Sequence, residues 1–319
     1  MSGNTARKID EALPTEDEEL DLPLNLIKKL RKPKIHPDDH KGKARERQPQ
    51  NTLKAKATPS TLVDLHFWDQ GRMGIFTLKP SQPLWDFKAG QYTSLGLDVP
   101  GRGFFMNAYS IASSPAQRDV LEFLIVLVHG GTLTPTMFNK KAGAKIGATW
   151  WYMKPVGNFH LGRTQKKNLF MIGTGTGVAP FHSMVKSLIE QGTIGEYRII
   201  CANGVRWTEG LGYRADFEAW QRKYPDNVLY LPTISRPEKD KGFDAKRHGR
   251  GRVDEVLKSA LAMGGTGQMP TGIDKDRFFE WINPAETAVL LCGHPGMCAE
   301  FGEQLRERGH EDVLTEDYW

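Results

Sequence analysis

The chain has 319 residues, of which 39% are hydrophobic and 25% are charged, and its formal net charge is +5. This composition is typical of a folded globular protein, excludes a fibrous or wholly disordered chain, and at this length favours about two domains. No stretch approaches the roughly 20 apolar residues of a membrane-spanning helix, so we expect no membrane span. The first residues have neither an apolar signal core nor a small-residue cleavage site, so we do not expect export.

Residues 1–55 are expected to form a disordered, charged extension. Residues 1–25 contain two basic and seven acidic side chains, whereas residues 26–56 contain eleven basic and three acidic ones. Only the segment 24–30 has the spacing of a short amphipathic helix, which is too little apolar surface to offset the entropy of ordering. We favour a solvated tail, and the alternative is a tether for an acidic partner or surface.

Residues 56–164 contain short apolar runs separated by turn residues. The runs lie at 62–68, 74–80, 91–97, 108–113, 121–128 and 148–153. Several β-rich runs at short spacing predict an antiparallel β-barrel or sandwich.

From residue 165 onward, the pattern changes to an alternation of strands and helices. Strands are expected at 168–173, 197–202, 227–235 and 288–293, and helices at 181–191, 213–224, 253–261 and 296–309. This alternation predicts a parallel sheet covered on both faces. Such sheets bind ligands beyond the carboxyl ends of their strands, so we expect a nucleotide-binding domain.

The most informative loop is GTGTGVAP, at residues 173–180, between a buried strand and a helix. Its glycines let backbone N–H groups approach a pyrophosphate, and Pro180 suits the first helical turn. The loop lacks the third-glycine spacing of the dehydrogenase fingerprint and the Gly-Lys-Ser/Thr of a Walker loop. The alternative is a tight turn that binds nothing.

Six motifs in this order resemble the ferredoxin–NADP reductase family, and the bacterial type is the most similar because it also ends in Tyr-Trp. The motifs are AYSIASSP (108–115), GTLT (131–134), GTGTGVAPF (173–181), SRP (235–237), CGHPGM (292–297) and EDYW (316–319). The resemblance covers residues 58–319. It implies an antiparallel FAD-binding β-barrel followed by a parallel α/β NADP(H)-binding domain. It also implies an oxidoreductase that passes electrons between NADPH, by hydride transfer to flavin N5, and a one-electron carrier such as ferredoxin or flavodoxin.

The resemblance assigns the flavin site to side chains of the first domain and the carboxyl terminus. Tyr109 would stack on one flavin face, the Ser110 hydroxyl would lie near N5, and Trp319 would cover the opposite face. The FAD residues it implies are Asn107, Ala108, Tyr109, Ser110, Gly131, Thr132, Leu133, Thr134, Thr176 and Trp319.

One position departs from the family pattern. Asn107 stands where the family usually has Arg, so a charge-assisted contact to the pyrophosphate becomes at most a neutral one. The hypothesis is that FAD binds more weakly or differently. Arg102 is a candidate for the compensating cation, and FMN is the alternative flavin.

The second domain is expected to prefer NADP over NAD because arginines follow its strands. The resemblance implies that Arg206, Arg236 and Arg252, with Ser235, bind the 2′-phosphate, where an NAD enzyme has an acidic residue. The alternative is that each arginine is a solvated surface charge. The resemblance places Cys292 beside the nicotinamide, although a buried core cysteine is the alternative, and gives Glu316 a role in proton handling. The NADP residues it implies are Gly175, Thr176, Gly177, Arg206, Ser235, Arg236, Arg252, Cys292, Gly293, Pro295 and Met297, and the catalytic ones are Ser110, Cys292, Glu316 and Trp319.

The cysteine count indicates an external electron acceptor. Three cysteines, of which Cys201 and Cys298 are interpreted as core residues, supply neither a disulfide framework nor the four thiolates of an iron–sulfur cluster. We therefore expect no metal, a reducing cytoplasm, and a separate acidic ferredoxin or flavodoxin steered by residues 26–56 or by the basic rim of the barrel. The alternatives are a flavin reductase or oxygenase reductase component, a non-catalytic NADP(H)-binding interaction module, and nucleic-acid binding through the tail.

Overall fold

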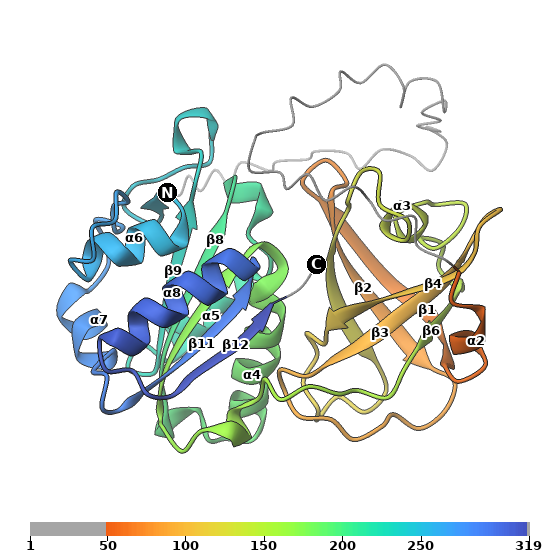
Figure 1. Cartoon of the computed structure of the whole chain (residues 1–319), viewed down its shortest axis with the longest axis horizontal. Coiled ribbons are helices and arrows are strands. Elements are labelled where there is room, and N and C mark those ends of the chain that lie inside the picture. Colours follow the sequence, from red (N-terminus) through yellow and green to blue (C-terminus); the bar gives the residue numbers. More distant parts are fainter. Residues whose placement is uncertain (1–48, 318–319) are drawn as a thin grey trace, which may run out of the picture. The chain divides into compact units, whose positions relative to one another are not determined.

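The computed structural model describes residues 49–317, which form an antiparallel and a parallel sheet (Figure 1). Residues 1–48 of the expected extension and the terminal Trp319 therefore lie outside the described residues. Positions 49–55 of the extension are described. There the expected disorder is not found, because α2 (Asn51–Lys54) follows a segment that is hydrogen-bonded to a strand. Asn51 Oδ1 accepts from Phe104 N at 2.9 Å, and Gln50 Oε1 accepts from Met106 N at 2.8 Å.

The first sheet has six antiparallel strands in the order β4-β3-β6-β1-β2-β5. Phe76, Trp150 and Tyr152 lie at the centre of its core and are fully buried. Beyond β4, Ala112 N donates to Glu122 O at 2.8 Å, which joins the two ends of the strand order and closes the sheet into a barrel. The strands are β1 (Thr58–Trp68), β2 (Met73–Pro80), β3 (Tyr92–Val99), β4 (Gly103–Ser110), β5 (Leu121–Val126) and β6 (Thr149–Tyr152), and the short helix α3 (Thr134–Met137) follows β5.

The second sheet has six parallel strands in the order β10-β9-β8-β7-β11-β12, with a separate hydrophobic core on each face. Every residue of β9 and β11 is buried, as expected for strands covered on both faces. The strands are β7 (Asn168–Thr174), β8 (Arg198–Val205), β9 (Val228–Ile234), β10 (Gly249–Arg250), β11 (Thr287–Gly293) and β12 (Val313–Asp317).

Helices of the second domain cover both of its faces. Residues of α4 (Ala179–Glu190) and α5 (Arg214–Lys223) pack in one core, and those of α6 (Val253–Ala260), α7 (Lys275–Trp281) and α8 (Pro295–Glu307) pack in the other. The predicted two-domain architecture is thus confirmed. Among the residues described, no helix combines the length and the apolar character that crossing a membrane requires.

Two details of the second sheet differ from the prediction. β8 continues to Val205 rather than ending at Ala202, because Asn203 and Gly204 still pair with β9. The sequence patterns did not predict β10, β12 or α7. β10 has only two residues, which show no periodicity, and β12 is a five-residue strand with partly exposed side chains.

Candidate active site

The predicted flavin motif and the predicted phosphate turn come together in the barrel. Asn107, Ala108, Tyr109 and Ser110 form the last four residues of β4. The Tyr109 hydroxyl donates to the Met137 sulfur at 3.4 Å, so the aromatic ring reaches α3, which begins where the Gly131–Thr134 turn ends. Because Tyr109 also packs against the barrel core, its ring has a defined position from which to form one wall of a flavin site.

Thr134 has a structural partner within its own turn. Its hydroxyl accepts from Val128 N at 3.0 Å and donates to Val128 O at 3.3 Å. The hydroxyl therefore closes the 128–134 loop. The donors that this turn offers to an FAD pyrophosphate are its backbone amides, which are the groups that such turns use.

Arg102 does not lie beside Asn107. It sits in the β3–β4 turn, with its guanidinium 5.4 Å from the centre of the Phe105 ring. Five residues of mostly extended chain separate the two Cα atoms by roughly 16 Å, so Arg102 does not occupy the position of the family arginine.

We therefore expect Asn107→Arg to slow FAD dissociation. A charged donor exceeds a neutral one by about 1–2 kcal/mol, which corresponds to roughly a 5- to 30-fold slower off-rate. The measurement is the release of flavin fluorescence after dilution of the holoprotein. A matched Asn139→Arg variant, in the turn after α3, controls for added charge, and an unchanged or faster off-rate would contradict the hypothesis.

The predicted coenzyme loop is held against the neighbouring strand end. It forms a 3-10 turn, Gly175–Val178, that leads from β7 into α4. The Thr174 hydroxyl accepts from His294 N at 2.9 Å, and Gly293 adopts φ +135, where a Cβ atom would lie 2.1 Å from that hydroxyl oxygen. Only glycine fits at 293. The loop amides at the start of the 12-residue helix α4 form a donor set that suits a pyrophosphate.

The predicted phosphate-binding arginines follow the carboxyl ends of three neighbouring strands of the parallel sheet. Val205 of β8 is in register with Ile234 of β9, which is in register with Arg250 of β10. Arg206, Arg236 and Arg252 follow these three strand ends within two residues, so they come from neighbouring strands at the same edge. This cationic edge suits a 2′-phosphate.

Two acidic groups near these strand ends, Glu238 and Asp254, have cationic partners. Glu238 accepts from Arg250 at 2.7 Å, and Asp254 lies 3.3 Å from Arg252 Nε. The Arg236 guanidinium lies 5.8 Å from the centre of the Trp207 ring. Glu238, which follows β9, thus forms an exposed ion pair with an arginine.

Two predicted catalytic residues meet although they are 206 residues apart. Ser110 Oγ, at the end of β4, donates to Glu316 Oε2 of β12 at 3.3 Å. Burial raises the pKa of the Glu316 carboxyl from its ordinary value to about 7, and Asp317 adds to the shift while the Ser110 hydrogen bond opposes it. Glu316 is therefore a carboxyl group that gains and loses a proton near neutral pH.

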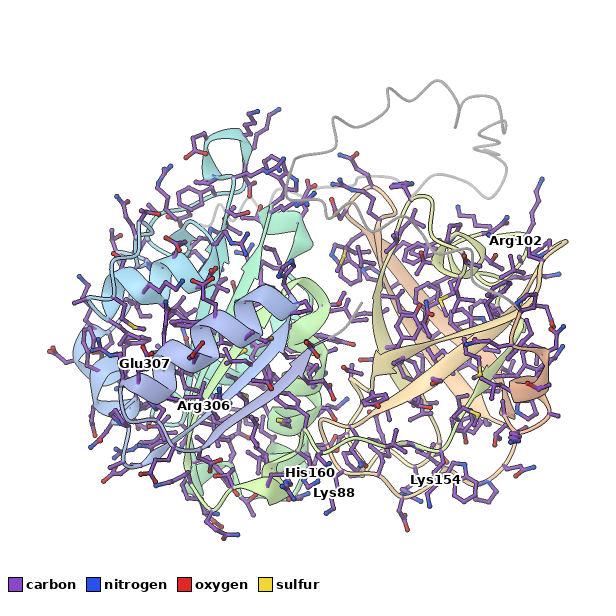
Figure 2. The ribbon with its side chains drawn as sticks, in the orientation of Figure 1. Lys88, Arg102, Lys154, His160, Arg306 and Glu307 are labelled. Carbon is purple, nitrogen blue, oxygen red and sulfur yellow. The ribbon has the colours of Figure 1, made fainter. Side chains whose placement is uncertain are left out.

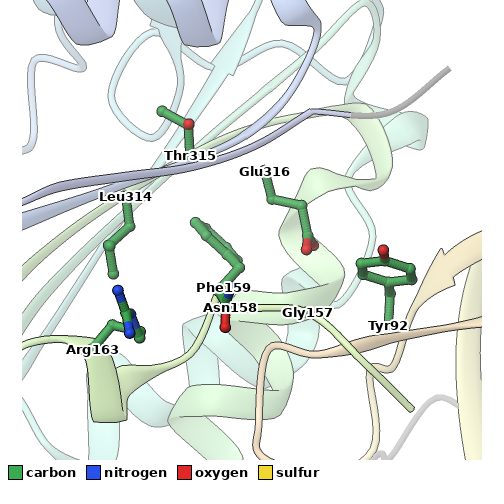
Figure 3. Close-up of a pocket in the computed structure, with 8 residues that line it drawn as sticks. All are labelled: Tyr92, Gly157, Asn158, Phe159, Arg163, Leu314, Thr315 and Glu316. Carbon is green, nitrogen blue, oxygen red and sulfur yellow. The ribbon is translucent and has the colours of Figure 1, made fainter. Parts of the chain in front are cut away.

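A pocket of about 340 Å³ opens beside Glu316, and Figure 3 shows the carboxyl end of Glu316 turned toward Tyr92. Gly157 permits this approach, because it adopts φ +117 and a Cβ there would lie 3.1 Å from the Tyr92 ring and 3.6 Å from Glu316 Oε1. No motif of the sequence indicated this pocket, although Tyr92 is in register with Ser110. The lining residues are Tyr92, Gly157, Asn158, Phe159, Arg163, Leu314, Thr315 and Glu316.

Cys292 lies between the two motifs. On β11 it is in register with Gly173 on one side and Glu316 on the other, and it is fully buried in a core cluster. Its place beside a nicotinamide stays a prediction. Burial raises the thiol pKa of Cys201, and it raises that of Cys298 to about 12, as expected for core cysteines.

The remaining predicted residues lie near the same strand ends. Pro295 is the first residue of α8, whereas Met297 is buried in the core beneath that helix. Thr176 lies in the coenzyme loop, and the role expected of Trp319 falls outside the described residues. Within residues 49–317, no group of three or more His, Cys, Asp or Glu side chains is arranged to bind a metal ion.

Comparisons with known proteins match both halves of the chain. Residues 70–161 match the oxidoreductase FAD-binding domain family, and residues 171–302 match the oxidoreductase NAD-binding domain family. A ferredoxin–NADP reductase of Pseudomonas aeruginosa is 29% identical over 259 residues, which cover 78% of this chain and 88% of the relative.

Solved structures share the fold. A ferredoxin–NADP⁺ reductase from Neisseria gonorrhoeae, with bound FAD and NADP, matches with a TM-score of 0.64 at 22% identity, covering 83% of this chain and 99% of that one. The cytochrome P450 reductase GcoB of Amycolatopsis matches with a TM-score of 0.61 at 23% identity, covering 82% of this chain and 69% of that one.

Proposed function

The chain belongs to the ferredoxin–NADP reductase family of FAD- and NADP(H)-dependent oxidoreductases, and from that premise we propose that it passes electrons from NADPH to an acidic one-electron carrier of the ferredoxin or flavodoxin class. The observation that carries this proposal is the contact between Ser110 of the flavin motif and Glu316 of the second sheet. It brings a hydroxyl and a carboxyl with a pKa near neutrality to the junction of the two cofactor-binding halves.

Each half of the chain has a binding task. Tyr109 and the amides of the 128–134 turn would hold FAD, and the loop amides at the start of α4 with Arg206, Arg236 and Arg252 would hold NADP(H). Bound FAD supplies the conversion between two-electron and one-electron transfer, which the protein side chains do not perform.

Glu316 is placed to accept a proton. Oxidation of NADPH by two one-electron carriers releases one proton in the net reaction, and a carboxyl group with a pKa of about 7 accepts a proton readily when it is ionised. Ser110 orients this carboxyl through its hydrogen bond, and the adjacent pocket connects the site with solvent.

The distribution of charge supports an acidic partner on the barrel side. Residues 49–164 contain twelve Lys and Arg and six Asp and Glu, whereas residues 165–319 contain twenty and twenty-two. Lys88, Arg102 and Lys154 are exposed cations of the barrel half, labelled in Figure 2. A surface with a net positive charge accelerates encounters with an acidic carrier.

The test is the reduction of purified acceptors by NADPH. We expect transfer to ferredoxin or flavodoxin with a KM for the carrier that rises several-fold between 50 and 300 mM salt (about 14 and 6 Å Debye lengths), because salt screens the attraction. Ferricyanide, a small acceptor, controls for effects of salt on the enzyme itself. Transfer to free flavin alone would favour a flavin reductase, and the absence of NADPH oxidation would favour a non-catalytic module. A KM for the carrier that is independent of salt would contradict its electrostatic attraction to the barrel.

A further inference from the structure

A buried histidine connects the helix after the coenzyme loop with the barrel. His182 of α4 is 2% exposed, and its ring stacks on Tyr213 with 3.7 Å between the ring centres. Its Nδ1 lies 2.9 Å from Ala112 O, in the segment that follows β4, and its Nε2 lies 2.8 Å from Asp216 Oδ2 of α5.

Both ring nitrogens of His182 face acceptors. A backbone carbonyl has no proton to donate. The hydrogen bond from His182, with the charges of His182 and Lys186, lowers the pKa of Asp216, so this partner is a carboxylate. A neutral imidazole has one N–H and satisfies one of the two acceptors, whereas the imidazolium satisfies both. The other titratable groups around the ring are Tyr213, stacked on it, and Glu122 of β5, which accepts from the Tyr213 hydroxyl at 2.8 Å.

The contact lies close in sequence to both cofactor motifs. Ala112 follows Ser110 by two residues, and His182 follows the last residue of the coenzyme loop, Val178, by four. The next residue of each segment forms a second hydrogen bond, in which the Ser183 hydroxyl donates to Ser113 O at 2.6 Å. The flavin motif and the coenzyme loop are therefore joined through short, hydrogen-bonded segments.

We propose that His182 is a positioning residue that sets the separation between the flavin motif at 107–110 and the coenzyme loop at 173–178, through the contact of its Nδ1 with Ala112 O. The inference rests on the proposed function, because the two motifs must present their cofactors to each other. His182 itself contacts neither motif. It acts through Ala112 on one side and the first turn of α4 on the other, and a misplacement of about 1 Å costs up to a hundredfold in rate.

The first test replaces the ring and keeps its stacking. His182→Phe leaves the buried Ala112 carbonyl without its donor, and we expect the rate at which saturating NADPH bleaches the bound flavin to fall roughly 10- to 100-fold. The KM for NADPH and the FAD content should change less than about threefold, since neither binding site is altered. The long-wavelength charge-transfer absorption of the flavin–NADP⁺ complex should weaken in parallel.

The matched control is His310→Phe. His310 is 3% exposed, and its amide donates to Leu305 O within the second domain. A comparable loss of bleaching rate in this control, or an unchanged rate and unchanged charge-transfer band in His182→Phe, would overturn the proposal.

The second test reads the protons of the ring directly. In the flavoprotein as purified, ¹⁵N NMR should show the His182 Nδ1 protonated, because its partner Ala112 O can only accept. In Asp216→Asn, Nδ1 should stay protonated, because it still donates to Ala112 O while Nε2 can accept from the asparagine amide. The Asp216→Asn variant should keep a bleaching rate within about threefold of the parent. An unprotonated Nδ1 in the parent protein would contradict the proposed contact with Ala112 O. If the bleaching and NMR results are as expected but no carrier protein is reduced, only the proposed function is contradicted.

Discussion

Replacement of Glu316 by Gln is expected to lower kcat for NADPH oxidation about a hundredfold and to remove the inflection near pH 7 from its pH profile. A positioned acid–base group contributes roughly 10²- to 10⁴-fold, and glutamine neither gains nor loses a proton. In the parent protein, kcat should rise as the pH increases through about 7, because the proton-accepting form is the carboxylate. Stopped-flow and steady-state rates between pH 5.5 and 9 measure the profile.

The same substitution should change the pH dependence of stability in a defined direction. Burial raises the pKa of Glu316 in the folded protein from 4.5 to about 7, so the folded state binds the proton more tightly than the unfolded state. The contribution of Glu316 protonation to the free energy of unfolding is fully present below about pH 4.5. It is lost as the pH rises through 7, and the loss is at most about 3 kcal/mol. The Glu316→Gln variant should therefore have a higher melting temperature than the parent protein at pH 8, and the two melting temperatures should be similar at pH 5.

An exposed neighbour provides the control for both measurements. Glu311→Gln changes the charge equally at a solvent-exposed position shortly before β12 and should leave the pH profile and the melting difference unchanged. If Glu316→Gln keeps the inflection near pH 7, another group carries it, and the assignment of proton acceptance to Glu316 is wrong.

Replacement of Arg236 by Ala should raise the KM for NADPH by roughly 10- to 100-fold and leave the KM for NADH within about twofold. Hydrogen bonds to charged groups contribute about 1.5–3 kcal/mol, and only NADPH carries the 2′-phosphate. The arginine follows β9 at the edge where Arg206 and Arg252 also lie. Steady-state kinetics with the two coenzymes measure the difference.

Arg198→Ala is the matched control, because Arg198 begins β8 at the opposite edge of the same sheet, where it pairs with Glu280 at 2.9 Å. Its KM for both coenzymes should stay at the parent value. Equal increases for NADPH and NADH in Arg236→Ala would mean that this arginine does not recognise the 2′-phosphate.

Local patterns were sufficient for most of the architecture. Alternating burial marks the barrel strands, and buried runs such as NLFMIG and AVLLCG mark the parallel strands, because the period of apolar residues follows directly from which faces are covered. The GTGTG loop was identifiable from its glycines between a strand and a helix, and Gly175 and Gly293 adopt positive φ angles, which favour glycine. Gly293 was assigned through the family resemblance.

Short or weakly periodic elements were not predictable from these patterns. β10 has two residues and β12 has five, so neither contains enough repeats to show a period. The limit of β8 was underestimated because Asn203 is polar although it is fully buried within the sheet.

The sequence by itself therefore determined the two-domain class and the positions of the glycine-rich and arginine-bearing loops, since these follow from the period of apolar residues and from local composition. Only the tertiary structure decided that Ser110 meets Glu316, that Tyr92 and Gly157 complete their pocket, and that His182 reaches Ala112. These contacts join residues separated by up to 206 positions, and they depend on strand order and helix packing, which a pattern of neighbouring residues does not encode.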